Sequence, residues 1–318
     1  MDIVFMGTPA FACPSLSALA HAGHRIVAVI TRTDKPRGRH GKPVHSDVKR
    51  CALEHGLPIL ETEKAGTPEF VARLAELKPH LGVVAAFGEK LSSEMLSVPE
   101  HGFLNVHASL LPKYRGAAPI TWAIVNGETE TGVTIIRLVE AMDAGPILLQ
   151  RATDLPSGET AGQLHDRLAE MGAELLVEAV AAVEDGTAQF TPQPEEGVSW
   201  APMLRKQDGL IRWTCSAEEI ARFVPGMTPW PGAFAFVKRQ SADRSERVVL
   251  VEIAKAQVPA SAAPGTVLDV RDDGILVAAG DGAVLFNRLK PAGGRDMSAA
   301  EYVRGHTVKA GDLFQAES

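Results

Sequence analysis

Asn105 and His107 are two hydrogen-bonding side chains, two residues apart in a short apolar run. If residues 104–108 form a strand, both side chains point to the same side, because successive residues of a strand alternate between faces. Open α/β sheets bind ligands at the carboxyl ends of their strands. The amide and the imidazole would then converge on one point. Such residues are also common as hydrogen-bonded core or surface groups, so this spacing alone leaves both interpretations open.

Asp143 is the separate carboxylate best placed to orient a histidine. It lies in the loop Met142-Asp143-Ala144-Gly145 between two apolar runs, where an aspartate by itself is an ordinary turn residue. The turn over residues 109–112 and the pair Arg115-Gly116 follow His107 closely and could expose backbone donors and carbonyls beside it. These neighbours favour the functional interpretation.

The elements that must hold these residues alternate between strand-like and helix-like spacing. Apolar runs typical of strands cover residues 2–6, 25–31, 57–60, 81–87, 103–108, 132–139 and 147–152, and helical spacing covers 14–21, 48–55, 70–77 and 160–184. Right-handed crossovers between parallel strands are the most economical connection for this order. The first part of the chain is therefore predicted to be an open, parallel α/β sheet.

The length of 318 residues favours two domains. A long helix over residues 160–184 would close the first domain, which we place at residues 1–186. Residues 187–203 contain three prolines and no periodicity, which is typical of an extended linker. Short apolar runs separated by Gly, Asp and Pro follow, so residues 204–318 are expected to form a small all-β barrel or sandwich.

Composition and cysteine usage exclude several classes of protein. Hydrophobic residues make up 45% and charged residues 22%, so the chain can bury a core and is not disordered. Its apolar runs are too short to span a membrane, and its start, Met1-Asp2-Ile3, lacks the basic region of a signal peptide. Three scattered cysteines neither staple a fold nor form a metal knuckle. We expect a cytoplasmic protein.

Cofactor-binding motifs are missing where an α/β fold would carry them. Gly7-Thr8-Pro9 follows the first predicted strand, but the sequence has no GxGxxG and no GxxxxGK[ST]. The histidines show no paired metal-ligand spacing, so no metal is expected. Cys13 is predicted to be a buried, inert thiol, because no paired base is evident.

One basic segment stands out in an acidic chain with a net charge of -7. This net charge argues against indiscriminate nucleic-acid binding. Residues 32–50 nevertheless contain seven basic side chains against two aspartates: Arg32, Lys35, Arg37, Arg39, Lys42, Lys49 and Arg50. Most such runs are solvated faces, and the charge pattern alone favours that interpretation.

Taken in order, the motifs resemble the folate-dependent formyltransferases, and among these the methionyl-tRNA formyltransferases. The core of the resemblance is NVHASLLP, from Asn105 to Pro112, followed by RGAAPI and the loop MDAG. FMGTPAFA, KPRGRHGKP, TPQPEEGVSWAP, WPGAFAF and LKPAGGRDMSA extend it over essentially the whole chain. The core signature indicates the superfamily; the basic loop and the C-terminal segments indicate the tRNA-specific branch.

This resemblance implies a fold, two substrates and a set of site residues. The fold would be a Rossmann-like formyltransferase domain followed by a small OB-like β-barrel that binds tRNA. The donor would be 10-formyltetrahydrofolate and the acceptor initiator methionyl-tRNA, with no metal and no demand for more than a monomer. The implied residues are Asn105, His107 and Asp143 for catalysis; Phe87, Gly88, Ser109, Leu110, Leu111 and Pro112 for folate; and Arg37, Arg39 and Lys42 for tRNA.

In this interpretation, Asn105 and a protonated His107 stabilise the oxyanion that forms when an amine attacks the formyl carbon. Asp143 orients His107 and favours its charged form. Two alternatives stay open: a formyltransferase that acts on a nucleotide-linked amino sugar or hydrolyses formyl-folate, and a non-catalytic RNA-binding protein with an OB-like module. The first would not need the basic loop, and the second would retain tRNA without folate-dependent turnover.

Overall fold

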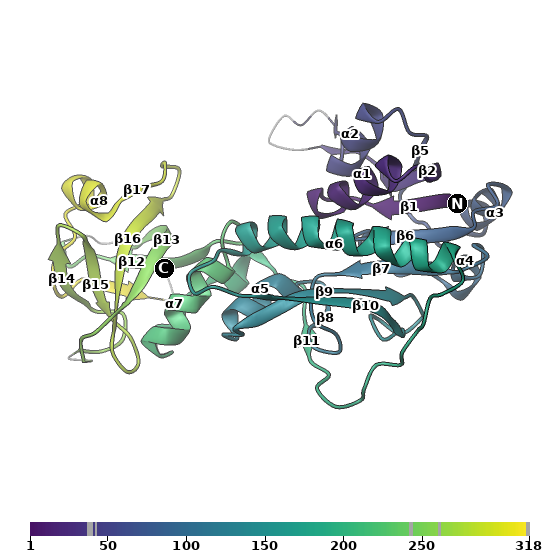
Figure 1. The fold of residues 1–318 in the computed structure, drawn as a ribbon. Coiled ribbons are helices and arrows are strands. Elements are labelled where there is room, and N and C mark those ends of the chain that lie inside the picture. Colours follow the sequence, from purple (N-terminus) through teal and green to yellow (C-terminus); the bar gives the residue numbers. More distant parts are fainter. Residues whose placement is uncertain (37–40, 42, 242–243, 260–261, 316–318) are drawn as a thin grey trace. The chain divides into compact units, whose positions relative to one another are not determined.

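The computed structural model describes residues 1–36, 41, 43–241, 244–259 and 262–315 (Figure 1). The chain divides into two compact units. The first contains Met1–Pro119, Glu130–Asp154 and His165–Pro202, and the second contains Ile120–Thr129, Leu155–Leu164 and Met203–Ser318. The chain therefore leaves the first unit and returns to it twice. Each unit is described by itself below.

The first unit is built on a seven-stranded sheet in the order β10-β9-β7-β6-β1-β2-β5. Its strands are β1 (Asp2–Gly7), β2 (Arg25–Arg32), β5 (Ile59–Thr62), β6 (Leu81–Ala85), β7 (Phe103–His107), β9 (Glu130–Arg137) and β10 (Ile147–Asp154). The five strands from β7 to β5 are parallel, which confirms the expected Rossmann-like arrangement. The sheet departs from the predicted parallel arrangement at one edge, where β9 pairs antiparallel with both β7 and β10.

Helices cover this sheet, and three of them begin at a side-chain cap. The helices are η1 (Ala10–Ala12), α1 (Cys13–His21), α2 (Asp47–Glu54), α3 (Pro68–Glu76), α4 (Ser93–Leu96) and most of α6 (Ala161–Glu184). Ser46, Thr67 and Ser92 each accept a backbone N–H in the first turn of the helix that follows. The short strands β3 (Lys35–Pro36) and β4 (Pro43–Val44) pair antiparallel on either side of the basic loop.

The sheet has an apolar core on each face, and this determines which way β7 presents its side chains. Phe103 belongs to a buried cluster with residues of α3 and α4, such as Leu74 and Met95. Val106 packs against Gly172 of α6. A Cβ atom added to Gly172 would overlap the Val106 side chain. Because strand residues alternate, Asn105 and His107 lie on the same face as Phe103.

The second unit contains an antiparallel sheet in the order β14-β15-β16-β13-β12-β18, with β17 paired to β16. Its strands are β12 (Ala233–Lys238), β13 (Glu246–Ala256), β14 (Val267–Arg271), β15 (Gly274–Ala278), β16 (Ala283–Pro291), β17 (Met297–Ser298) and β18 (Leu313–Gln315). Its helical elements are most of α5 (Pro119–Val125), η2 (Lys206–Gly209), α7 (Ala217–Gly226) and α8 (Ala299–His306). Over the residues described, the strand pairing does not define a closed barrel.

Two features of the second unit were not predicted from its sequence: an aromatic cluster and the helix α8. Trp213, Phe286 and Phe314 form a cluster of ring contacts with centroids 5.4 to 5.8 Å apart. The short apolar runs of this region gave no indication of α8. Ser298 and Glu301 form a capping box at the start of α8, so its sequence did contain a helix start signal.

Residues 187–202, most of the predicted linker, are part of the first unit and pair with its strands. Thr191 and Ile147 exchange two backbone hydrogen bonds of 2.7 and 2.8 Å. The strand β11 (Trp200–Ala201) pairs in parallel with β8 (Arg115–Gly116), immediately after the signature turn. In the part of the chain described here, no helix is long and apolar enough to cross a membrane.

The close packing of β6 on β7 gives a first prediction. A Cβ atom added at Gly82 of β6 would overlap the ring of Phe103 on β7. Gly82→Ala should therefore destabilise the protein by about 1–3 kcal/mol, because a packed core resists an added methyl group. Urea unfolding monitored by circular dichroism measures the change. The control is Gly66→Ala, where the added Cβ meets nothing within 4 Å; equal midpoints for the two variants would contradict the prediction.

Candidate active site

The candidate site lies at the carboxyl ends of β6 and β7, which pair in parallel with Val84 beside Asn105. The loop after β6 contains Phe87 and Gly88, and the loop after β7 contains the turn at residues 109–112. The hairpin loop between β9 and β10 contributes Asp143. Because β9 runs antiparallel to β7, this loop leaves the sheet beside the start of β7, and its Asp143 reaches back to His107 at the carboxyl end. Three loops thus meet at one edge of the sheet, where α/β folds bind ligands.

Asn105 and His107 are both buried, with 9% and 6% of their surfaces exposed. The Nε2 atom of His107 lies 3.0 Å from the carbonyl oxygen of Tyr114. A carbonyl can only accept, so the tautomer that satisfies this contact carries its proton on Nε2 and donates it to Tyr114. The other ring nitrogen, Nδ1, is then the position at which His107 can gain or lose a proton.

The structure brings Asp143 to this second nitrogen, 36 residues away in sequence. The distance from Asp143 Oδ2 to His107 Nδ1 is 3.8 Å, which is an ion-pair distance but too long for a hydrogen bond. The same oxygen accepts a 2.8 Å hydrogen bond from the backbone N–H of Gly116. Asp143 therefore supplies negative charge beside Nδ1 while a second loop holds its carboxylate in place.

The predicted folate residues lie on both sides of this pair. Phe87 is buried, and its carbonyl oxygen accepts a 3.3 Å hydrogen bond from the Thr8 hydroxyl, so the loop after β1 supports it. Gly88 has a φ of 84°, and a Cβ built on it would meet no atom within 4 Å, so open space adjoins this backbone. Ser109 and Leu111 are buried, whereas Leu110 and Pro112 are partly exposed.

Backbone strain is concentrated around the site. Ala86, Tyr114 and Asp143 have φ angles of 47°, 61° and 49°, in the left-handed region that non-glycine residues rarely adopt. Each of the three lies in one of the loops that meet at the carboxyl end of β7. Strained residues of this kind persist only where their surroundings hold them, and they often mark functional sites.

A buried hydrogen-bond network supports the turn after β7. The Thr134 hydroxyl donates to the Ser109 carbonyl oxygen at 2.6 Å and accepts from Leu111 N at 3.1 Å. Gln150 Nε2 donates to the Leu111 carbonyl oxygen at 3.0 Å and to Thr134 Oγ1 at 2.8 Å. The sequence analysis did not single out Thr134 or Gln150, because polar residues at alternate positions of an edge hairpin are common.

Two residues of the predicted linker also contact the site loops. Gln193 binds the Arg115 guanidinium and the backbone of the Asp143 loop. The Ser199 hydroxyl accepts a 2.9 Å hydrogen bond from the backbone N–H of Tyr114, the residue whose carbonyl binds His107. No local pattern marks these two residues, since their partners lie 48 to 85 residues away.

The tRNA-binding residues inferred from the sequence, Arg37, Arg39 and Lys42, lie outside the described residues. Three other basic residues of the segment are paired with carboxylates. Lys49 Nζ lies 2.8 Å from both Asp34 and Glu61, Arg32 lies 2.9 Å from Glu89, and Arg50 pairs with Asp47. The hydrogen bond from Lys49 holds the pKa of Asp34 below its usual value. These three cations therefore contribute little free charge to a partner.

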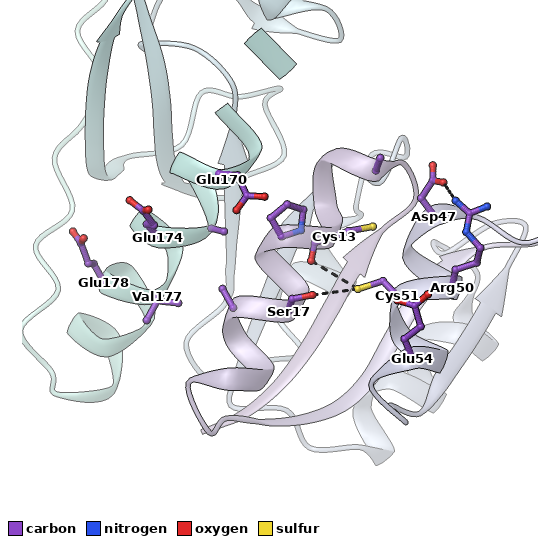
Figure 2. Close-up of a pocket in the computed structure, with 14 residues that line it drawn as sticks. Cys13, Ser17, Asp47, Arg50, Cys51, Glu54, Glu170, Glu174, Val177 and Glu178 are labelled. Atoms are coloured by element: carbon purple, nitrogen blue, oxygen red, sulfur yellow. Dashed lines mark hydrogen bonds and ion pairs between the residues drawn. The ribbon is translucent and has the colours of Figure 1, made fainter. Parts of the chain in front are cut away.

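A cavity of about 940 Å³ lies away from these residues, among α1, α2 and α6 (Figure 2). It is lined by cysteines and carboxylates and by none of Asn105, His107 or Asp143. We therefore place the candidate reaction at the strand ends, where the hydrogen-bond donors are. Within the described ranges, no group of three or more His, Cys, Asp or Glu side chains could hold a metal ion.

Comparisons with known proteins identify the family. The model of the "Formyl transferase" family matches residues 1–180, and that of the "Formyl transferase, C-terminal domain" matches residues 203–307. The methionyl-tRNA formyltransferase of Acetivibrio thermocellus is 44% identical over 314 residues, 99% of each chain. That of Symbiobacterium thermophilum is 44% identical over 99% of this chain and 95% of its own.

Solved structures share the fold at low identity. An N-formyltransferase from Helicobacter canadensis, in complex with folinic acid and dTDP-3-aminofucose, has a TM-score of 0.63 at 17% identity, covering 89% of this chain and 98% of its own. HypX from Aquifex aeolicus in complex with tetrahydrofolic acid has a TM-score of 0.60 at 20% identity, covering 95% of this chain and 46% of its own. With the full-length relatives above, these matches lead to one conclusion: the chain belongs to the methionyl-tRNA formyltransferase family.

Proposed function

We propose that this chain transfers the formyl group of 10-formyltetrahydrofolate to the α-amine of initiator methionyl-tRNA, in the cytoplasm and for translation initiation. The observation that carries the chemistry is the approach of Asp143 to His107 at the end of β7, two residues after Asn105. Relatives that share more than 40% of their residues along the full chain support the choice of substrate.

The catalytic roles follow from what formyl transfer requires. The attacking amine bonds to the formyl carbon, and the formyl oxygen becomes negative. Asn105 and a protonated His107 would donate hydrogen bonds to that oxygen, in a buried environment where such bonds are strong. Because Nε2 donates a hydrogen bond to the Tyr114 carbonyl, Nδ1 is the nitrogen through which His107 would donate or accept a proton. Asp143 Oδ2 lies 3.8 Å from that nitrogen.

A proton must also pass from the attacking amine to the folate nitrogen that leaves. His107 Nδ1 and Asp143 Oδ2 are 3.8 Å apart, so a water or the amine itself could join them in the complex. None of the three residues forms a covalent bond to the substrate in this scheme. No activated serine or cysteine nucleophile is therefore required.

The residues beside the pair fit a flat, polar-edged ring such as a pterin. Phe87 and Leu111 supply buried apolar groups. Ala86 and Gly88 adopt left-handed conformations, and open space adjoins Gly88. Pterin nitrogens can pair with backbone donors and acceptors presented this way. We infer that Phe87, Gly88 and residues 109–112 bind the folate donor.

The division of labour between domains is also part of the proposal. Residues 1–186 would carry the chemistry, 187–203 would connect the domains, and 204–318 would bind tRNA as an OB-like barrel, in a monomeric enzyme. Backbone hydrogen bonds join Phe314 to Gly265 at 2.7 Å and Val267 to Asp312 at 2.8 Å, so β18 approaches the start of β14. This approach of the two edge strands supports the OB-like assignment. Arg37, Arg39 and Lys42 would contact the acceptor stem.

The first functional prediction concerns Asn105, His107 and Asp143. Replacing each by Ala should lower kcat by on the order of 100 to 1,000-fold, since each removes stabilisation specific to the transition state. Their effects should be non-additive because the three act together. The assay is formyl transfer from 10-formyltetrahydrofolate to charged initiator tRNA, with His21→Ala, an exposed histidine, as control. A His107→Ala enzyme with near-normal single-turnover rates would show that the assignment is wrong.

The second functional prediction concerns the basic loop. Arg39→Ala should weaken the use of methionyl-tRNA and reduce the slope of log K against log[salt] by about 0.7 to 0.9, because a phosphate contact releases counterions. Folate binding should not change. Arg50→Ala is the matched control, since Asp47 already pairs with that arginine. An unchanged kcat/KM and an unchanged salt slope for Arg39→Ala would favour an amino-sugar acceptor instead.

A further inference from the structure

The side chain of Gln193 satisfies all of its hydrogen-bonding capacity at the site loops. Its oxygen accepts from Arg115 Nε at 3.1 Å and from an Arg115 terminal nitrogen at 2.7 Å. Its amide nitrogen donates to the carbonyl oxygens of Asp143 at 2.7 Å and Gly145 at 2.8 Å. One glutamine thus joins the loop after β7 to the loop that carries the candidate carboxylate.

The backbone that Gln193 binds is strained and closely packed. Asp143 has a φ of 49°, which costs energy for a residue with a Cβ atom. Gly145 lies so close to the carbonyl oxygen of Arg137 that no Cβ could be added. Without Gln193, two loop carbonyls and a guanidinium would lose their partners, and the loop would be free to relax from this geometry.

We propose that Gln193 is a positioning residue that sets the separation between Asp143 and His107. This inference rests on the proposed function and adds to it that the connecting segment is part of the catalytic machinery. Ser199 supports the other member of the pair, His107. The Ser199 hydroxyl accepts a hydrogen bond from the Tyr114 backbone N–H, and the Tyr114 carbonyl oxygen accepts one from His107 Nε2. Both members of the His107–Asp143 pair are therefore held by residues of one segment.

The test uses full-length Gln193→Ala and measures kcat and KM separately. Misplacement of a catalytic group by about 1 Å can cost on the order of 100-fold in rate. We expect a loss of that order in kcat with little change in KM for either substrate. Gln193→Glu keeps the acceptor for Arg115 but removes the donor to Asp143 and Gly145, so it should not restore kcat. The control is Gln189→Ala, an exposed glutamine of the same segment.

A double-mutant cycle separates positioning from general stabilisation. In an Asp143→Ala background, Gln193→Ala should cost little further in single-turnover rate, because the group it positions is gone. An equal cost in both backgrounds, or a normal kcat for Gln193→Ala, would overturn the proposal. If Asp143→Ala itself is fully active, the catalytic assignment fails, and Gln193 then has no carboxylate to position.

A separate observation concerns two cysteines far from the candidate site. Cys13 on α1 and Cys51 on α2 both line the cavity shown in Figure 2, and both are free thiols. Cys51 Sγ lies 3.4 Å from the Ser17 hydroxyl and 3.9 Å from the Cys13 carbonyl oxygen. The Ser17 hydroxyl also lies 3.0 Å from His55 Nε2. The expected inert thiol at Cys13 therefore has a second thiol, a hydroxyl and an imidazole nearby.

This environment makes the two thiols unequal. The side chain of Cys13, the Ser17 hydroxyl and the charge of His55 lower the pKa of Cys51 to about 6, although burial raises it. The side chain of Cys51 and burial raise the pKa of Cys13. Cys51 therefore has the lower pKa of the two, as a reacting cysteine beside a resolving cysteine needs.

We propose that Cys51 and Cys13 form a peroxide-reactive pair that closes to a disulfide between α1 and α2. The Cys51 thiolate would attack one oxygen of hydrogen peroxide; the O–O bond breaks, hydroxide leaves, and Cys51 becomes a sulfenic acid. The Cys13 sulfur would then attack Cys51 sulfur, the S–O bond breaks, and water leaves with the thiol proton. Two thiols are oxidised by two electrons while one peroxide is reduced to two waters.

Peptide mass spectrometry of the peroxide-treated full chain tests this pair. We expect a Cys13–Cys51 cross-linked peptide that has lost two hydrogens, with Cys215 still a free thiol. Cys13→Ser should trap sulfenic acid on Cys51, detectable with a cyclic 1,3-dione, while Cys215→Ser should leave the cross-link unchanged. The proposal is overturned if Cys215 oxidises before Cys51, or if Cys51 oxidises in the wild type without bonding to Cys13.

Discussion

The hydrogen bond between His107 Nε2 and the carbonyl oxygen of Tyr114 is the interaction on which the proposed chemistry depends. It commits one ring nitrogen to the protein and leaves the other facing Asp143. The bond requires the chain to turn back on β7 within seven residues, and Tyr114 adopts a left-handed conformation to do so. Ser199 binds the N–H of the same residue. The orientation of the imidazole is therefore set by the main chain of a strained turn, which a distant segment holds in place.

The surrounding structure must offset the free energy that this site costs in buried polar groups and backbone strain. Buried polar groups without partners are unfavourable, and left-handed residues add strain. The network of Thr134 and Gln150 satisfies the turn after β7, and Gln193 satisfies the Asp143 loop. Thr134 and Gln150 lie on the hairpin β9–β10, whose antiparallel pairing distinguishes this sheet from a purely parallel one. The hairpin thus contributes both the candidate carboxylate and the support for the neighbouring turn.

Local periodicity was sufficient to predict most strands and helices of the first unit, and the alternation of strand residues placed Asn105 and His107 on one face. Asp143 was expected to be the carboxylate that orients His107, but its approach could not follow from spacing, because it depends on how the loop between β9 and β10 folds back to the end of β7. Gln193 and Ser199 were missed for a related reason. Their partners are 48 to 85 residues away, so nothing near them in sequence marks their role. A proline-rich, aperiodic segment was interpreted as a linker, although its polar side chains complete the site.

Ion pairing also changes what the basic segment can contribute. By composition, seven cations are spread over residues 32–50, yet Arg32, Lys49 and Arg50 are paired with carboxylates of the fold. The charges at Arg37, Arg39 and Lys42 fall between the short strands β3 and β4, whose pairing brings the two ends of that loop together. Within residues 32–50, attraction for a phosphate backbone would then come mainly from this loop. The net charge of -7 would disfavour RNAs that cannot reach the loop.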